Sequence, residues 1–192
     1  MCLASDTNPR CISHRDLGIP DGRGATISKP FDMNAKLIEI YFASAAGAPM
    51  QNVDSIRALA RTGLEGDRYS RKAGTYSKFP GAHDVTLFEI EAIWDFYQFS
   101  GMDLHPSQVR RSLITEGVKL VDLINAEFSI GPVRFSGLRP CPPCLYLSQL
   151  LKIPELLRGL AHSGGIYAEI LNEGVLSVGD SVSLMNSDRM TL

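Results

Sequence analysis

Two cysteines set among prolines are the residues of this sequence best suited to chemistry. Cys141 and Cys144 lie in the segment Arg-Pro-Cys-Pro-Pro-Cys, residues 139–144. Proline fixes φ and lacks an N–H donor, so this segment predicts a stiff turn that holds both thiols in a defined direction. A neighbouring arginine, here Arg139, favours the thiolate, which is the form that attacks sulfur or ligates a metal. We therefore expect a reactive thiolate or a metal ligand rather than two small buried side chains.

Zinc binding is an alternative use of the same pair. Cys11 and His14 have a suitable local spacing and would complete a Cys3His set with Cys141 and Cys144. This site requires the polar segment 1–30, which has no hydrophobic period, to fold over the cysteine turn. A thioredoxin-type dithiol is a further alternative, but such a motif opens a helix in a βαβ context, and no βαβ pattern precedes this pair.

Arginines in two other segments are candidates for binding an anion. A glycine-rich segment ends in Asp67 and Arg68, and its glycines would let backbone N–H groups approach a ligand. It lacks the spacing of the common nucleotide loops, and the local sequence favours the competing interpretation, a tight turn in which Asp67 and Arg68 are solvated or paired. Arg110, Arg111 and Ser112 stand where we predict a strand to start. Side chains alternate along a strand, so one arginine would reach a ligand and the other would meet solvent.

The elements expected to position these residues are mostly short strands. Turn signals separate apolar or alternating runs at 37–43, 53–59, 85–88, 110–114, 128–131, 133–138, 166–171, 175–178 and 181–185. Helical spacing covers 89–100, with Gly101 as its stop, and a shorter helix is expected at 154–160. Loops are expected at 63–69 and 76–84. This pattern predicts a mainly β fold, a barrel or sandwich with helical decoration, that follows an irregular N-terminal extension over residues 1–36.

Length and charge limit the possible classes. A chain of 192 residues can form one domain, and a net charge of −2 argues against nucleic acid as the main partner. Residues 1–23 contain no continuous apolar run, so we expect neither a signal peptide nor a membrane partner, and a cytoplasmic location.

The order of several motifs resembles that of one known family. These motifs occupy 37–50, 63–69, 85–89, 110–113, 123–131, 140–144, 164–168 and 174–180. Together they resemble the MOSC domain, which is named for the C-terminal domain of molybdenum cofactor sulfurases, in a stand-alone, bacterial-type form. The resemblance implies a MOSC-type β-barrel with a few short helices over residues 37–187.

The same resemblance implies a role for the cysteine turn. In relatives that hold the molybdopterin form of the molybdenum cofactor, a cysteine thiolate ligates the metal, and Cys144 matches that position. The resemblance makes Arg68, Arg110 and Arg111 candidates for holding the cofactor's phosphate, since a planar fork suits phosphate. The remaining candidates for cofactor binding are Asp67, Ser112 and Arg139. Ser112 stands where the family often has asparagine, so one donor is kept and the amide is lost.

Three functions are consistent with these residues. The first is an oxidoreductase in which a Cys144-ligated molybdenum–pterin centre reduces small oxidised or N-hydroxylated substrates. The second is a sulfur carrier, in which Cys144 receives a persulfide from a partner cysteine desulfurase and delivers it to a metal–sulfur or molybdenum cofactor acceptor. Cys141 could then resolve the persulfide as a disulfide. The third is an anion- or cofactor-binding module without chemistry. We expect no pyridoxal-phosphate domain, and we therefore expect a sulfur donor or an electron donor to be a separate protein.

Overall fold

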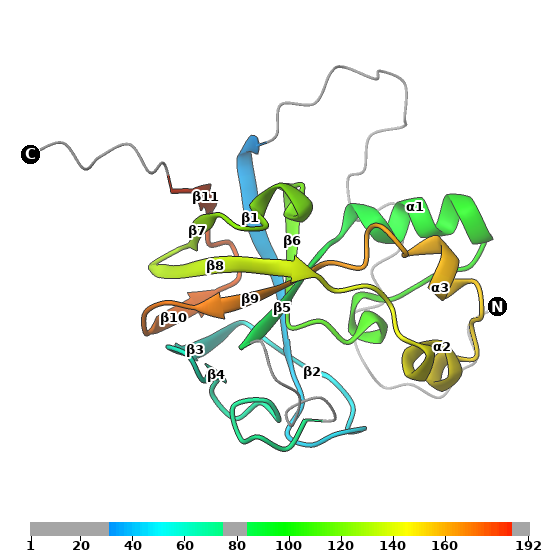
Figure 1. The fold of residues 1–192 in the computed structure, drawn as a ribbon, viewed down its shortest axis with the longest axis horizontal. Coiled ribbons are helices and arrows are strands. Elements are labelled where there is room, and N and C mark those ends of the chain that lie inside the picture. Colours follow the sequence, from blue (N-terminus) through cyan, green and yellow to red (C-terminus); the bar gives the residue numbers. More distant parts are fainter. Residues whose placement is uncertain (1–30, 75–83, 186–192) are drawn as a thin grey trace, which may run out of the picture.

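A curled, mostly antiparallel sheet dominates the molecule (Figure 1). The computed structural model describes residues 31–74 and 84–185. The strands of its eight-stranded sheet follow the order β11-β7-β8-β9-β5-β6-β1-β2, and only β5 and β6 pair in parallel. Their bounds are β1 (Phe31–Phe42), β2 (Gln51–Val53), β5 (Val85–Glu89), β6 (Leu113–Val118), β7 (Glu127–Ile130), β8 (Val133–Pro140), β9 (Ile166–Ile170) and β11 (Val182–Leu184). A three-stranded sheet contains β10 (Gly174–Ser177), β3 (Ser55–Leu59) and β4 (Gly63–Leu64).

The large sheet curls far enough for strand β1 to meet the segment that leads into β11. Leu37 N–H donates to the Asp180 carbonyl at 2.8 Å, and Gly179 N–H donates to the Leu37 carbonyl at 2.7 Å. Lys36 also forms a bridge to Ser181. These bonds satisfy main-chain groups that would otherwise lie at an exposed edge, and they give the sheet the form of a half-barrel.

Side chains that alternate along the strands build the main core inside this half-barrel. On β9, Ile166, Ala168 and Ile170 are buried in it, while Tyr167 between them is only half-buried. On β5, Leu87 belongs to this core and Phe88 belongs to a second core on the outer face. The large sheet therefore lies between two cores, and some of its strands carry apolar residues on both faces.

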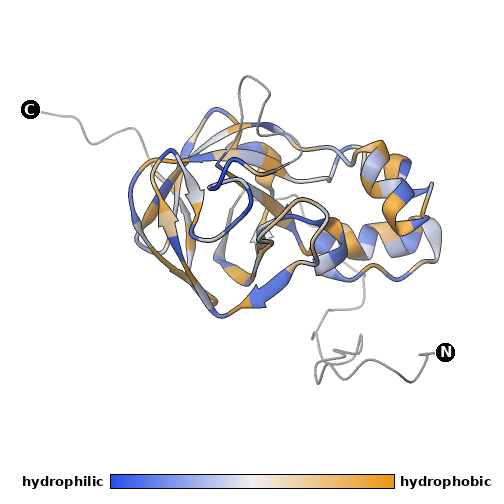
Figure 2. Cartoon of the chain, turned by 90° about the horizontal axis from the view of Figure 1, so that it is seen from below, coloured by the Kyte–Doolittle hydropathy of each residue, from blue (hydrophilic) through white to orange (hydrophobic). Residues whose placement is uncertain are grey.

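Three α-helices cover the outer face over the second core. They are α1 (Glu91–Ser100), α2 (Leu145–Leu151) and α3 (Leu156–Gly159), and they lie together at one end of the molecule (Figures 1 and 2). Phe96 of α1 and Leu156 of α3 pack there against sheet residues that include Phe88. Figure 2 shows that apolar stretches occur on both the strands and the helices. Two 3-10 helices, η1 (Pro106–Val109) and η2 (Leu120–Leu123), complete the described elements.

Most of the predicted elements are confirmed. The mainly β fold, the hairpin formed by β7 and β8, and helix α1 are present, and Gly101 ends α1 with a left-handed φ of 69°. Within the part of the chain that the structure describes, no helix is long and apolar enough to cross a membrane. The predicted loop at 76–84 lies almost wholly outside the described residues, as do residues 1–30 of the predicted extension.

Some predictions of elements were wrong in their extent or type, and one helix was missed. The strand expected from residue 37 begins at Phe31, and the strand expected over 53–59 is two strands, because the chain changes sheet between β2 and β3. Residues 110–112 are not the start of β6, because Arg110 takes a left-handed conformation, with φ of 55°, where it ends η1. Helix α2 was not expected, since seven residues after two prolines give too short a stretch for its spacing to be recognised.

Candidate functional site

The cysteine turn connects strand β8 to helix α2. Cys141 N–H donates to the Gly165 carbonyl at 2.8 Å, which holds the turn to the segment before β9. Cys144 has an extended backbone at the N-terminal boundary of α2, and its carbonyl accepts from Ser148 N–H at 3.1 Å. The side chain of Cys141 is 1% exposed, while Cys144 is half-buried and packs partly against the second core. Cys144 is therefore the more exposed of the two cysteines in this turn.

Arg111 holds the same turn from the other side. Its Nη2 donates to the Cys141 carbonyl at 2.8 Å and to the Pro142 carbonyl at 3.2 Å. Its Nε donates to the Gly164 carbonyl at 3.0 Å, and its Nη1 donates to the Val109 carbonyl at 3.1 Å. The guanidinium thus ties three separate segments of main chain together.

Gly164 allows the turn to come this close. A Cβ at this position would lie 2.6 Å from the Cys141 carbonyl oxygen and 2.9 Å from the Cα of Pro142. It would also lie 3.0 Å from the Cδ of Pro143. Two of these three contacts are main-chain atoms and the third belongs to a proline ring, so none can rotate away. The main chain before Cys144 therefore packs directly on Gly164.

The surroundings of Cys141 keep its thiol protonated. Burial raises its pKa, and the opposing effects of Arg111, of a hydrogen bond with Tyr167 and of Arg139 do not cancel this rise. The Arg139 guanidinium lies 4.1 Å from the centre of the Tyr167 ring. Burial and the neighbouring Cys141 also raise the pKa of Tyr167, so its hydroxyl stays neutral. Cys141 is a buried thiol beside a neutral phenol.

Asp67 and Arg68 form a buried ion pair in the loop after β4. Arg68 Nη1 lies 3.3 Å from Asp67 Oδ2, and the two side chains are 7% and 4% exposed. Asp67 also accepts from Ala43 N–H at 3.0 Å and from Tyr69 N–H at 2.9 Å. The Arg68 guanidinium lies 4.7 Å from the centre of the Tyr69 ring. The competing interpretation therefore holds in its paired form, since Asp67 and Arg68 are paired and buried rather than solvated.

Arg110 brings a second positive charge to the neighbourhood of Arg68. Its Nη1 donates to the Ala48 carbonyl at 2.9 Å. Its pKa is lowered by burial and, next, by the positive charge of Arg68. Tyr146, Tyr69 and the Asp67 carboxylate oppose this lowering of the pKa of Arg110. Two partly desolvated guanidiniums near one carboxylate leave an excess of positive charge, which is the electrostatic requirement for an anion site.

Tyrosines connect this charged region with the cysteine turn. Burial raises the pKa of Tyr69, which also responds to Arg68 and to Cys141, so Tyr69 lies within electrostatic range of both. Tyr146, two residues after Cys144, is likewise near enough to Arg110 to affect its pKa. The structure therefore brings Arg68 and Arg110 into the same region as the cysteine turn.

A comparison with models of protein families shows which family this chain resembles. A family model described as the MOSC domain matches residues 84–183, which include the cysteine turn and Arg110. The chain belongs to the MOSC domain family. No curated protein sequence matches this MOSC protein.

Solved structures of bacterial proteins share the fold. The YuaD protein of Bacillus subtilis superposes with a TM-score of 0.67 at 18% identity, over 78% of this chain and 94% of that one. YiiM of Geobacillus stearothermophilus has a TM-score of 0.59 at 15% identity, over 82% of this chain and 78% of that one. YiiM of Escherichia coli has a TM-score of 0.58 at 16% identity, over 79% of this chain and 70% of that one.

The donor set of the described residues is compatible with a metal that brings ligands of its own. In residues 31–74 and 84–185, no group of three or more His, Cys, Asp or Glu side chains could hold a metal ion. An ion held by protein alone needs about three or four such ligands. Cys144 could therefore ligate a metal that arrives in a cofactor carrying its own ligands, as a pterin-bound metal does. The Cys11 and His14 of the alternative zinc site lie outside the described residues.

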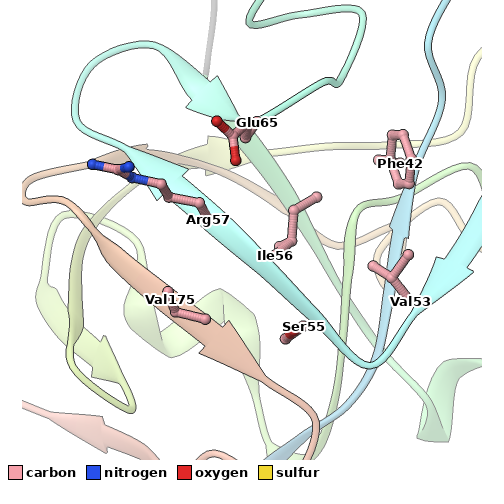
Figure 3. A pocket seen from close by; sticks show the side chains of 7 residues that line it. All are labelled: Phe42, Val53, Ser55, Ile56, Arg57, Glu65 and Val175. Atoms are coloured by element: carbon pink, nitrogen blue, oxygen red, sulfur yellow. The ribbon is translucent and has the colours of Figure 1, made fainter.

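One predicted site residue, Ser112, is buried and bonded to strand β5. Ser112 is 4% exposed, its hydroxyl lies 3.4 Å from the hydroxyl of Thr86, and its N–H donates to that hydroxyl at 3.1 Å. A separate surface hollow of about 350 Å³ beside β3 contains none of the predicted site residues (Figure 3). Its lining comprises Phe42, Val53, Ser55, Ile56, Arg57, Glu65 and Val175.

Sequence reasoning missed the aromatic part of the site. Tyr69 directly follows Arg68, Tyr146 follows Cys144 by two residues, and Tyr167 lies between two core residues of β9. The only available signal was the position of each tyrosine beside a motif. Stacking of Tyr167 with Arg139 depends on the pairing of β8 with β9, which joins Arg139 to Tyr167 in register.

Proposed function

We propose that this MOSC protein holds a molybdenum–pterin cofactor through the Cys144 thiolate and reduces small oxidised or N-hydroxylated substrates. The observation that carries the proposal is that the cysteine turn is bonded to Arg111, next to Arg110, while Arg110 in turn is affected by the charge of Arg68. A soft thiolate suits a thiophilic metal, and arginine forks suit a phosphate. When bound, the cofactor supplies the two-electron redox chemistry.

The side chains of this chain have distinct tasks in the proposal. Cys144 supplies the single protein ligand, and its thiol is fixed by the turn that precedes it. Arg68 is oriented by Asp67 and Tyr69, so it is preorganised to donate to an anionic group. Arg110 adds a second guanidinium, and binding an anion would relieve its repulsion from Arg68. Arg139 is exposed and stacked on Tyr167, which suits it to the rim of the site.

Metal analysis of protein purified from cells that make the pterin cofactor tests this function. We expect stoichiometric molybdenum in the wild type, its loss in Cys144→Ala and its retention in the matched control Cys141→Ala. Arg110→Met should lower the molybdenum content without unfolding the protein, because Arg110 is only half-buried. Reduction of an N-hydroxylated test substrate should follow the molybdenum content across these variants.

Other metal contents would contradict the proposal and favour one of the alternatives. Absence of molybdenum, together with a mass increase of about 32 Da on Cys144 from one added sulfur, would indicate the sulfur carrier. Zinc that is lost in Cys11→Ala would indicate the Cys3His site. Absence of metal and of added sulfur, with retained binding of a pterin phosphate, would indicate a binding module.

A further inference from the structure

The prolines of the cysteine turn create a shortage of hydrogen-bond donors. Residues 140, 142 and 143 are proline, so only Cys141 and Cys144 can donate main-chain N–H groups between residues 140 and 144. The Cys141 N–H is used by the Gly165 carbonyl. The turn therefore cannot satisfy its own buried carbonyls, which must find donors elsewhere in the fold.

Arg111 supplies these donors. All three of its nitrogens donate to main-chain carbonyls, and four bonds of 2.8 to 3.2 Å use four of its five N–H groups. The residue is only 9% exposed. A single N–H remains, so the guanidinium cannot present a two-pronged fork to a phosphate while these bonds last.

We propose that Arg111 is a positioning residue for Cys144 and does not contact the cofactor phosphate. By fixing the carbonyls of Cys141 and Pro142 against Gly164, it gives the Cys144 thiol one direction and keeps Cys141 sealed. This inference rests on the role proposed above for Cys144, and it replaces the phosphate-binding role predicted for Arg111. The anion site is then left to Arg68 and Arg110.

Thiol alkylation of cofactor-free protein tests the proposal without relying on activity. The full-length wild type, Arg111→Met, Arg111→Lys and the exposed control Arg134→Met are prepared from cells that cannot make the pterin. Iodoacetamide is added over a pH series, and peptide mass spectrometry follows Cys141 and Cys144 separately. In the wild type we expect Cys144 to react and Cys141 to be protected.

We expect Arg111→Met to expose Cys141, with alkylation on the order of tenfold faster or more, because the turn opens locally. The alkylation rate of Cys144 at a fixed pH should change as well, because its thiol loses its fixed direction. Arg111→Lys should restore little of the protection, because one ammonium group cannot span three segments of main chain. Arg134→Met should match the wild type at both cysteines.

Several outcomes would overturn the proposal. One is a folded Arg111→Met whose Cys141 and Cys144 profiles equal those of the wild type, with a molybdenum content lowered as in Arg110→Met. That result would assign Arg111 to the anion. If Arg111→Met does not fold, Arg111→Lys decides, and wild-type protection of Cys141 in that variant refutes the positioning role. Absence of molybdenum from wild-type protein would remove the proposed function but leave the alkylation result intact.

Discussion

Replacing Gly164 by alanine tests whether close packing of the main chain controls the cysteine turn. The new methyl group would lie 2.6 Å from the Cys141 carbonyl oxygen, 2.9 Å from Pro142 Cα and 3.0 Å from Pro143 Cδ. The backbone of Gly164 does not have a positive φ, so alanine meets no conformational penalty there. The whole effect should therefore come from displacement of the turn.

The expected magnitude follows from the cost of forcing one methyl group into a packed site. Such insertions typically destabilise a protein by about 1–3 kcal/mol. Because the blocked atoms are main chain and proline ring, we expect the turn to move by several tenths of an ångström rather than a side chain to rotate. That movement lengthens the Arg111 bonds to the turn, so Cys141 should lose protection and molybdenum binding through Cys144 should weaken.

Urea unfolding and cysteine alkylation together measure both consequences. Gly101→Ala is the matched control, because a Cβ added at this position would have no atom within 4 Å, while the φ of 69° makes alanine strained. A left-handed alanine costs about 1–2 kcal/mol, so the two variants should lose similar stability. Only Gly164→Ala should change the alkylation of the two cysteines. Equal alkylation profiles in both variants, or an unaltered stability of Gly164→Ala, would refute the packing argument.

Three further predictions concern the parts of the fold that support the site. Phe96→Ala should lower the free energy of unfolding, measured by urea titration, by about 3–5 kcal/mol, because Phe96 is fully buried in the second core. Phe99→Ala should lower it far less, because the Phe99 side chain is 51% exposed. Asp67→Ala should lower the free energy of unfolding by about 3–5 kcal/mol, because it leaves the buried Arg68 charge without its partner, and Asp67→Asn should lower it less. Loss of the exposed Arg57 ion pair should change the free energy of unfolding by about 1 kcal/mol or less. Burial raises the pKa of Glu89 above its ordinary 4.5, so the folded protein binds a proton on this carboxyl more tightly than the unfolded chain does. The contribution of Glu89 to stability therefore falls as pH rises from 4.5 through the raised pKa. Glu89→Gln should remove that part of the decline when unfolding free energy is measured against pH, and a variant with the wild-type decline would contradict the burial argument.

Local patterns in the sequence were sufficient for most strands and for the main helix. Alternation over residues 166–171 predicts β9, and the Gly131-Pro132 pair marks the turn between β7 and β8. These features depend on neighbours along the chain, which a local pattern records. The local pattern gave a wrong prediction at Arg110, because this residue ends a 3-10 helix and does not start a strand.

The sequence by itself determined that two cysteines stand in a donor-poor proline turn and that several motifs follow the order of a MOSC domain. It could not assign tasks to the arginines, because their partners are distant in the chain. Arg111 donates to a carbonyl 53 residues away, and Arg110 donates to one 62 residues away. Only tertiary packing decides which guanidinium donates its N–H groups to main-chain carbonyls and which retains N–H groups for an anion. That difference depends on contacts between residues far apart in the sequence, which no local spacing encodes.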